Sequence, residues 1–415
     1  FNVFRESLDW YCSRLLQSRK VVLTNFLGSN VALVDWPLYM EHLHRLEVDG
    51  AMAPSYPVSL SRMLGPDSIL SLPGGKGHMK HKRLRNKILA NLAPKSVLAF
   101  VPEVIDLVRQ TLDKMVEDSE RDGYSSFHHH AAALAADVSG LPITAGLEPE
   151  LQRQVSRLLD TMSDSVIAFP INLGRFTRCG RGMLAKKRLR WIIKDIMDSP
   201  NLSRRNIISD LVRVSEDGKG FTVGEMVDTV ATLMLAGKLT TAEILPALVV
   251  HAHQHPDWAQ RMAQERLDFA GCEDDSATLR FVREIMRMQM PAGQIQRRLL
   301  DTSRSIDLGE HGTIPPGTIL AVFFRKELEG MGNHFDPDRW AVESLRPQSL
   351  MPFGGNQPHQ CIGKNLALLE LQVFLRVLCA EYEFETPDAK LVAQSPFITK
   401  SYSDGLRVKI SRKTA

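Results

Sequence analysis

The sequence has few cysteines, and none of them is paired in a motif. The five in its 415 residues are widely spaced, without a CxxC pair: Cys12, Cys179, Cys272, Cys361 and Cys379. An odd number without such spacing argues against a disulfide framework and against a zinc cage. We therefore expect a reducing compartment, in which the glycosylation sequon that begins at Asn201 is a chance match.

The sequence also lacks a long apolar run and a strong charge of either sign. Its most apolar stretch, Val227–Val250, is interrupted by Lys238 and Glu243, so it is not expected to span a membrane. A formal net charge of +3 is too small to suggest nucleic-acid binding. Because the first residue is Phe1 rather than methionine, an N-terminal anchor or targeting segment could have been removed.

Several catalytic and metal-binding motifs are missing as well. No HExxH, GxSxG or paired-carboxylate signature occurs. The stretch Pro73–His78 resembles a phosphate loop, but a glycine follows Lys76 where Ser or Thr is required. We expect no metal at the histidine clusters His128–His130 and His251–His255, because successive side chains on a helix point in different directions.

What the sequence does contain is a mainly helical pattern. Its 44% hydrophobic and 24% charged residues are typical of a soluble globular enzyme. Apolar residues recur every three or four positions in five segments: Leu98–Met115, Leu151–Phe169, Lys186–Met197, Thr222–Val250 and Ile362–Leu378. Strand-like runs lie near Lys20–Val34 and Arg297–Phe324, and "SDGL" at Ser403–Leu406 predicts a hairpin turn. We predict one domain over residues 1–415, mainly α with small β-sheets, and a helix kink at Pro246.

A cluster of basic residues occupies Arg175–Arg190, directly after the apolar segment Val166–Leu173. Such a cluster is typical of a solvated helix face. The other interpretation is a surface that contacts a membrane or a redox partner.

Cys361 follows a loop that contains Gly354 and Gly355 and precedes the helical pattern that starts at Ile362. The glycines permit backbone conformations that other residues resist. The sulfur would then lie at a helix N-terminus, where unpaired amides favour thiolate over thiol. Such a thiolate could ligate iron or act as a nucleophile, whereas a buried, inert cysteine is the alternative interpretation.

Two other segments carry a possible charge cluster. Glu284 and Arg287 are three positions apart on one predicted helix face, where they can pair, and Arg339 in "FDPDRW" offers a second cation. A Glu-x-x-Arg pair is common on helix surfaces. The pair becomes specific only through the order of these two segments in the sequence and their distance from Cys361.

Taken together, these segments resemble the cytochrome P450 family of haem-thiolate enzymes. The resemblance rests on Glu284 and Arg287, on Phe335–Trp340 and on the run from Phe353 through Cys361-Ile-Gly-Lys-Asn-Leu-Ala, and it covers nearly the whole chain. "HKRLR", "FPINLG" and "FDPDRW" are similar to the branch of eukaryotic steroid, terpenoid and retinoid hydroxylases. The family fold is a single large, mainly helical haem-binding domain with small β-sheets.

The resemblance implies a role for each matching residue. Cys361 would be the proximal ligand of the iron in haem b. Further contacts with the haem are expected from His81, Arg85, Phe353, His359 and Gly363, and from either Arg297 or Arg298. Glu284, Arg287 and Arg339 would brace the cysteine loop. Thr240 and Thr241 would be catalytic, and the substrate would contact Leu233, Ala236, Gly237, Ala292 and Phe397.

Two departures from the family pattern bear on mechanism. The cysteine loop has one extra residue, and Gln357 replaces a glycine. In the central helix, Leu239 takes the place of an acid, preceded by Lys238, and leucine cannot carry a proton. Proton delivery would then depend on Thr240 and water, on Lys238 or on the substrate. The alternative is a peroxide-handling isomerase, dehydratase or peroxygenase.

The resemblance implies a monomeric monooxygenase that hydroxylates a lipophilic small molecule, such as an isoprenoid, sterol or fatty acid. Electrons would come from an NADPH-dependent reductase or a ferredoxin, which would dock near Lys364. The expected location is the cytosolic face of the endoplasmic reticulum membrane if an anchor was removed, and otherwise the cytoplasm. A haem-bound sensor or carrier without turnover is a third interpretation.

Overall fold

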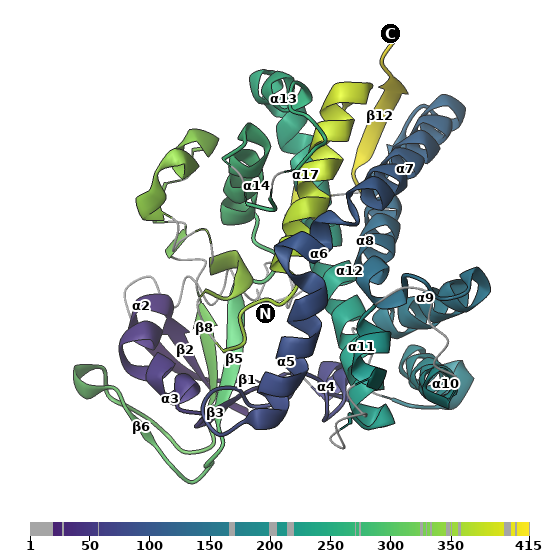
Figure 1. Ribbon diagram of the computed structural model, residues 1–415. Helices are drawn as coiled ribbons and strands as arrows, with labels where there is room; N and C mark the ends of the chain where they lie inside the picture. The colour runs from purple at the N-terminus through teal and green to yellow at the C-terminus, as the bar shows by residue number, and fades with distance from the viewer. Residues whose placement is uncertain are drawn as a thin grey trace.

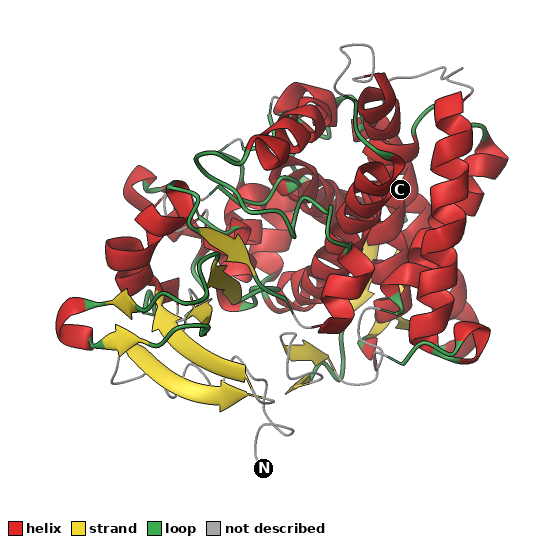
Figure 2. Ribbon diagram, turned by 90° about the horizontal axis from the view of Figure 1, so that it is seen from below, coloured by secondary structure: helices red, strands yellow, loops and turns green. Residues whose placement is uncertain are grey.

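The computed structural model describes most of the chain. The described residues are 20–414, except for 27–28, 57, 166–170, 199–205, 214–219, 270, 274, 324–326, 329, 333, 346–348, 350, 356–357, 394–399 and 403–404. Helices make up most of the protein, and the largest sheet lies at one side of them (Figures 1 and 2). The predicted fold class, mainly α with small sheets, is confirmed.

The longest helix, α12 (Val223–Gln254), runs through the middle of the helical region in Figure 1. It begins with a capping box, because Thr222 and Glu225 each accept a hydrogen bond from the other's backbone amide. The helix continues past Pro246, although proline has no N–H to donate to the carbonyl of Ala242. Among the described residues, it alone is long and apolar enough to cross a membrane, but 61% of that stretch is buried in the protein, as expected of a core helix.

Most of the other helices that contact α12 surround it on several sides. Those that build the cavity region are α5 (Met79–Leu92), α8 (Phe127–Thr144) and α17 (Lys364–Glu381). The others are α2 (Trp36–Leu38), α3 (His44–Val48), α4 (Val58–Leu64), α6 (Pro94–Leu98), α7 (Val101–Asp122), α9 (Pro149–Ser163), α10 (Arg178–Asp198), α11 (Ile207–Arg213), α13 (Pro256–Ala263) and α14 (Ala277–Met288). The helix predicted over Leu151–Phe169 ends at Ser163, so its predicted C-terminal end was wrong.

The largest sheet has the strand order β1-β2-β8-β5-β3. Its strands are β1 (Val21–Phe26), β2 (Ser29–Asp35), β3 (Met52–Pro54), β5 (Gln294–Leu299) and β8 (Ile319–Phe323). The β2–β8 pair is parallel, with Val31 opposite Ile319, and the other pairs are antiparallel. This sheet joins two segments that are far apart in the sequence, both of which the strand-like runs predicted.

Three smaller sheets complete the described structure. They are formed by β6 (Ile306–Asp307) with β7 (Thr313–Ile314), by β10 (Leu391–Ala393) with β11 (Lys400–Tyr402), and by β4 (Ser125–Ser126), β12 (Arg407–Arg412) and β9 (Tyr382–Glu385). Ser403 and Asp404 of the hairpin predicted at Ser403–Leu406 lie outside the described residues. This segment connects β11 to β12, which pair with different neighbours in different sheets, and both Gly405 and Leu406 have positive φ angles.

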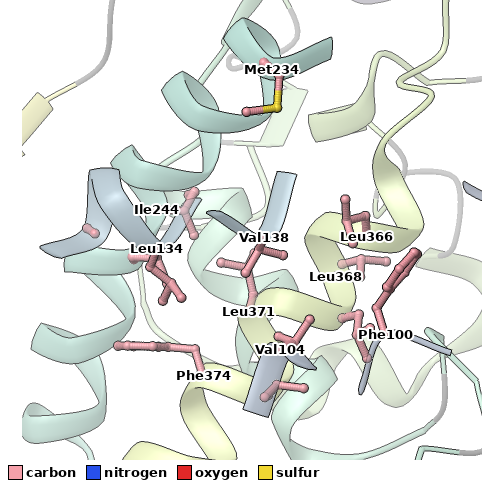
Figure 3. Packing of buried hydrophobic residues seen from close by; sticks show 14 of the residues in the cluster. Phe100, Val104, Leu134, Val138, Met234, Ile244, Leu366, Leu368, Leu371 and Phe374 are labelled. Carbon is pink, nitrogen blue, oxygen red and sulfur yellow. The ribbon is translucent and has the colours of Figure 1, made fainter. Parts of the chain in front are cut away.

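The main hydrophobic core lies where α8, α12 and α17 meet. In Figure 3, Leu134 and Val138 of α8 are close to Leu371 and Phe374 of α17, with Ile244 of α12 beside them. Each is at most 2% exposed. Burying a side chain of this size contributes about 2 kcal/mol. This packing holds α17, which starts directly after the cysteine loop, against the central helix.

Candidate active site

A large cavity lies between α5, α8, α12, α17 and the loop before α17. Its empty volume is about 1520 Å³, part of it open to solvent, and its walls are mostly apolar. The structure brings twelve of the predicted site residues into this lining: His81, Arg85, Leu233, Ala236, Gly237, Thr240, Thr241, Ala292, Phe353, His359, Cys361 and Gly363. Ile69 and Leu70 add apolar wall from the segment after α4.

The cysteine loop presents Cys361 to this cavity. The backbone N–H of Cys361 donates a hydrogen bond of 2.8 Å to the carbonyl of Phe353, which closes the loop. Gly354 and Gly355 have φ angles of 83° and 64°, and a Cβ at Gly355 would lie 2.9 Å from the ring of Trp36. Both positions therefore require glycine. The Cys361 side chain is exposed, but toward the cavity rather than toward bulk water.

The structure corrects the expected charge state of the Cys361 thiol. Burial raises its pKa above the ordinary value of 9.0, and this effect exceeds the opposing effects of the Gly363 and Lys364 amides and of Arg85. The position at the start of α17 therefore does not by itself produce a thiolate. A positive charge that approaches the sulfur from the cavity is needed to hold it deprotonated at neutral pH.

Positively charged and imidazole side chains gather at one side of the cavity. Arg85 Nη1 donates to the carbonyl of Gln360 at 2.8 Å, next to the cysteine. The rings of His81 and His359 are 4.6 Å apart between centroids. Burial first, and then the charge of His359, lowers the pKa of His81 to about 3, so this ring is neutral at physiological pH.

Glu47 of α3 is the centre of this region, and sequence reasoning missed it. Its fully buried carboxylate accepts hydrogen bonds of 2.8 Å from Arg297 Nε and from His359 Nδ1, and a third from the Tyr39 hydroxyl. Burial alone would raise its pKa, but these bonds from His359 and Arg297 lower it to about 2. His359 Nε2 faces the carbonyl of Leu72 at 2.9 Å, so both ring nitrogens already have protein partners.

The two arginines of β5 were left as alternatives by the sequence, and the structure separates them. Successive residues of a strand point to opposite faces. Arg297 is buried against Glu47, whereas Arg298 is exposed and does not line the cavity. The expectation that Arg298 lies at the site is therefore wrong.

The Glu284 carboxylate is buried in the predicted charge cluster. Arg287 donates to both of its oxygens at 2.8 and 3.0 Å, and Arg339 Nε lies at 3.2 Å. The backbone amide of Asp336 and the indole of Trp340 donate to it as well, at 3.0 and 2.9 Å. Arg287 and Arg339 also donate to four backbone carbonyls between residues 328 and 334. The cluster thereby joins α14 to the chain that leads to the cysteine loop.

The residues that depart from the family pattern, Lys238 and Leu239, lie in the part of α12 beside the cavity. The Thr240 hydroxyl donates to the carbonyl of Ala236 at 2.7 Å. Lys238 forms a 2.8 Å ion pair with Asp160 of α9. Leu239 packs against an apolar cluster that includes Met63 and Leu235. Neither side chain is therefore placed to deliver a proton into the cavity.

The basic segment of α10 is only partly a solvated face. Lys186 is held inside by a 2.7 Å ion pair with Asp228 and by the carbonyl of Met63. The outer side also carries large apolar side chains: Leu184 and Trp191, seven positions apart, are 50% and 60% exposed. Phe176 in the short helix η3 (Gly174–Phe176) is 77% exposed.

Some predicted positions lie outside the described residues. These are Phe397 of the expected substrate contacts and Gln357 of the cysteine loop. The cavity wall also includes residues that were not predicted, among them a carboxyl. Glu370 of α17 was recognisable only as a carboxyl within the apolar pattern that follows Cys361.

Comparisons with known proteins agree with this geometry. The family described as Cytochrome P450 matches residues 57–402. Abscisic acid 8'-hydroxylase 3 of Oryza sativa subsp. indica is 28% identical, over 86% of this chain and 73% of that protein. 7,8-Epoxymelianol synthase CYP88A154 of Ailanthus altissima is 24% identical, over 80% and 70%. The retinoic acid-bound structure of cyanobacterial CYP120A1 superposes with a TM-score of 0.79 at 20% identity, over 99% and 96%.

Proposed function

This chain belongs to the cytochrome P450 family and is a monooxygenase with haem b as its cofactor; from that premise we propose that Cys361 binds the haem iron and that the cavity takes a lipophilic, isoprenoid-like substrate for hydroxylation. The observation that carries the proposal is the Cys361 side chain, which opens into a large, mainly apolar cavity. The iron is the positive charge that the sulfur requires to remain a thiolate.

The residues around the cavity fit a haem group. When bound, haem b supplies the redox chemistry that splits O2 with two electrons. Arg85 would contact a propionate from α5, and the neutral His81 would offer a hydrogen bond beside it. Arg297 and His359 would act mainly through Glu47, which already accepts from both. Phe353 and Gly363 would pack next to the thiolate, and the Glu284 cluster would hold the approach to the loop.

The substrate would lie against α12 and the loop after α14. Leu233, Ala236 and Gly237 provide one wall, and Ala292 and Ile69 provide others. These side chains offer dispersion contacts and no charge, which favours a molecule with a large apolar surface. Two relatives have names that refer to abscisic acid and to 7,8-epoxymelianol, and this supports an isoprenoid-like substrate. Thr240 and Thr241 would orient water near the reacting carbon.

The redox partner, a reductase or a ferredoxin, would dock where α17 begins. Lys364 lies at that end, and Asn365 Nδ2 donates to the carbonyl of Leu92 at 2.9 Å, which joins it to the end of α5. The exposed Lys95 of α6 adds a cation nearby. Because Lys364 is already paired with Glu273, its neighbours would carry much of the attraction. The chain would act as a monomer with one catalytic domain.

We also propose that the outer side of α10 rests on a membrane surface, at the cytosolic face of the endoplasmic reticulum. Trp191, Leu184 and Phe176 offer exposed apolar surface, and Lys187 and Arg188 lie between them in the sequence. Apolar side chains combined with cations favour the headgroup region of an anionic bilayer. The proposal is supported if vesicles that contain anionic lipid retain the protein and if Trp191→Ser weakens that retention.

The runner-up function is the handling of an organic peroxide, because Leu239 stands where an acid is usual. One experiment separates the two functions. Lipophilic compounds are first screened for a shift in the spin state of the haem, and a hit is then incubated with NADPH, a reductase and isotopically labelled O2. Incorporation of one labelled oxygen atom into the product supports hydroxylation. Efficient turnover of a fatty-acid hydroperoxide without reductase, and no labelled product, would favour the runner-up.

A further inference from the structure

Thr232 of α12 carries a hydroxyl in the cavity wall that the proposed function does not use. The residue is 1% exposed, and its Oγ1 atom lies 2.6 Å from the hydroxyl of Ser68, in the segment after α4. Ser68 is fully buried, and its hydroxyl also accepts a hydrogen bond of 3.2 Å from the backbone amide of Leu70. The side chains beside this pair in the cavity wall, Ile69, Leu70 and Leu233, are apolar.

The two hydroxyls of this pair have more protons to donate than the protein has acceptors for them. Each hydroxyl carries one proton. One of the two protons forms the bond between Ser68 and Thr232, and the Leu70 amide brings a third donor rather than an acceptor. Within the described residues, the second hydroxyl proton is therefore left without an acceptor. A buried donor in this state costs free energy, which an oxygen atom of a bound molecule recovers.

Thr232 differs in its hydrogen bonding from other threonines in the helices of this protein. The hydroxyls of Thr144 and Thr240 each donate to the carbonyl four positions earlier, at 3.0 and 2.7 Å. Such a bond consumes the hydroxyl proton within the helix. The corresponding carbonyl for Thr232 is that of Asp228, but Thr232 bonds across to Ser68 instead. Its hydroxyl is therefore directed away from its own helix, at the wall of the cavity.

The segment that contains Ser68 is held in place on both sides of this residue. On one side, the backbone amide of Asp67 donates to the carboxylate of Asp228 on α12 at 3.2 Å. On the other side, Nε2 of His359 faces the carbonyl of Leu72 at 2.9 Å. Ser68 is thereby fixed against α12 before a substrate enters. The substrate does not have to order the hydroxyl pair, so a hydrogen bond to it contributes more to binding.

The charges near Thr232 disfavour an anionic ligand at this end of the cavity. Asp228 lies about one helical turn before Thr232, and the cation beside it, Lys186, is already paired with it at 2.7 Å. Among the described residues that line the cavity, Arg85 is the only arginine or lysine, and it lies next to the cysteine loop. A carboxylate at Thr232 would be buried without a cation, which costs far more than burying a hydroxyl or a ketone.

We propose that Thr232, held by Ser68, donates a hydrogen bond to a neutral oxygen atom of the substrate, and that the enzyme therefore selects an uncharged isoprenoid alcohol or ketone over the corresponding acid. This inference rests on the proposed monooxygenase function. Thr232 lies eight positions before Thr240, which corresponds to about 12 Å along α12. The recognised oxygen atom therefore belongs to a part of the substrate that is remote from the reacting carbon.

The test measures binding to the haem-loaded enzyme at pH 8, by the shift in the spin state of the haem, and needs no turnover. Each set of probes shares one carbon skeleton and differs in one group. The two sets are farnesol, farnesene and farnesoic acid, and abietadienol, abietadiene and abietic acid. For a skeleton that binds, we expect the alcohol to bind about fivefold more tightly than the hydrocarbon and at least about tenfold more tightly than the ionised acid.

Thr232→Val keeps the shape of the side chain and removes its hydroxyl. We expect this variant to bind the alcohol about fivefold more weakly and the hydrocarbon as before, and we expect Thr232→Ser to restore the preference for the alcohol. Thr229→Val is the matched control. Thr229 is also a fully buried threonine of α12 with an Oγ1 atom that has no partner in the described part of the chain, but it does not line the cavity. Its variant should bind all probes like the natural enzyme.

If Thr232→Val does not bind haem, Ser68→Ala takes its place, because Thr232 is then free to donate to the carbonyl of Asp228 and should lose the same preference. The inference is overturned if the natural enzyme binds the acid as tightly as the alcohol, or if the variant loses alcohol and hydrocarbon binding equally. A natural enzyme without a thiolate-ligated haem spectrum, or one whose haem responds to none of the probes, would instead overturn the proposed function and the inference with it.

Discussion

Glu47 and Glu370 are both buried carboxyls next to the active-site region, but their surroundings drive them to opposite charge states. Glu47 receives hydrogen bonds from Arg297, His359 and Tyr39, and its pKa falls to about 2. Within the described residues, Glu370 has one oxygen without a hydrogen-bond partner, and burial and the charge of Asp137 raise its pKa. Burial is common to both, and the partners decide the outcome.

The comparison divides the site into a charged side and a neutral side. At the charged side, Arg297 and His359 surround the carboxylate of Glu47. At the neutral side, apolar helices surround Glu370, whose pKa is raised. Substitutions that remove one carboxyl at a time test whether this division is real.

The largest effect is expected at Glu284, a third buried carboxyl. Like Glu47, it is paired with cations. Glu284→Ala leaves Arg287 and Arg339 without their anion in a buried site, and we expect the free energy of unfolding to fall by about 4 kcal/mol. Denaturant unfolding measures this change. Asp275→Ala is the control, because its pair with Arg280 is largely on the surface and should be worth less than about 1 kcal/mol. Equal losses in the two variants would contradict the role of the cluster.

Glu47→Gln tests the charged side itself. A fall in pKa from 4.5 to about 2 corresponds to about 3 kcal/mol of stability at neutral pH. Because the folded-state pKa is lowered, this stability is present above pH 4.5 and is lost as the pH falls toward 2. The difference in unfolding free energy between the natural protein and the variant should therefore shrink in acid. A difference that does not depend on pH would mean that Glu47 is not ionised.

Glu370→Gln should show the opposite pH dependence. Its folded-state pKa is raised, so the native protein keeps a proton that the unfolded chain releases above the ordinary pKa of 4.5. The natural protein should then lose stability relative to the variant by about 1.4 kcal/mol per pH unit above that value, until the folded-state pKa is reached. Chemical unfolding at a series of pH values measures the slope. A slope of the same sign as that of Glu47→Gln would remove the contrast.

The smallest effect is expected at Arg298. This exposed residue lies on the outer face of β5, so Arg298→Ala should change the unfolding free energy by less than about 0.5 kcal/mol and should leave haem retention unchanged. Arg297→Ala is the matched comparison, and it should lose haem faster because it leaves Glu47 buried with one cation fewer. Haem transfer to apomyoglobin measures both rates. Faster loss from Arg298→Ala than from Arg297→Ala would reverse the assignment.

Local patterns allowed much of the fold and part of the site to be predicted. The helix that follows Cys361 and the pairing of Glu284 with Arg287 depend on spacings of a few residues, which the sequence displays directly. Two partners of Glu47, Arg297 and His359, lie 250 and 312 positions away, and no local pattern connects them with it. The pairing of β11 with β10, and of β12 with β4 and β9, could not be predicted for the same reason, since the packed fold determines which strands pair. The pKa of Cys361 was predicted in the wrong direction because burial outweighs the helix N-terminus.

The most direct test of the account is the spectrum of the reduced, carbon monoxide-bound protein, compared between the natural chain, Cys361→Ala and Cys179→Ala. Cys179 is a buried cysteine away from the loop and serves as the matched control. We expect the absorption typical of thiolate-ligated haem in the natural chain and in Cys179→Ala, and its loss in Cys361→Ala. If Cys361→Ala keeps that absorption, another residue binds the iron and the account is wrong.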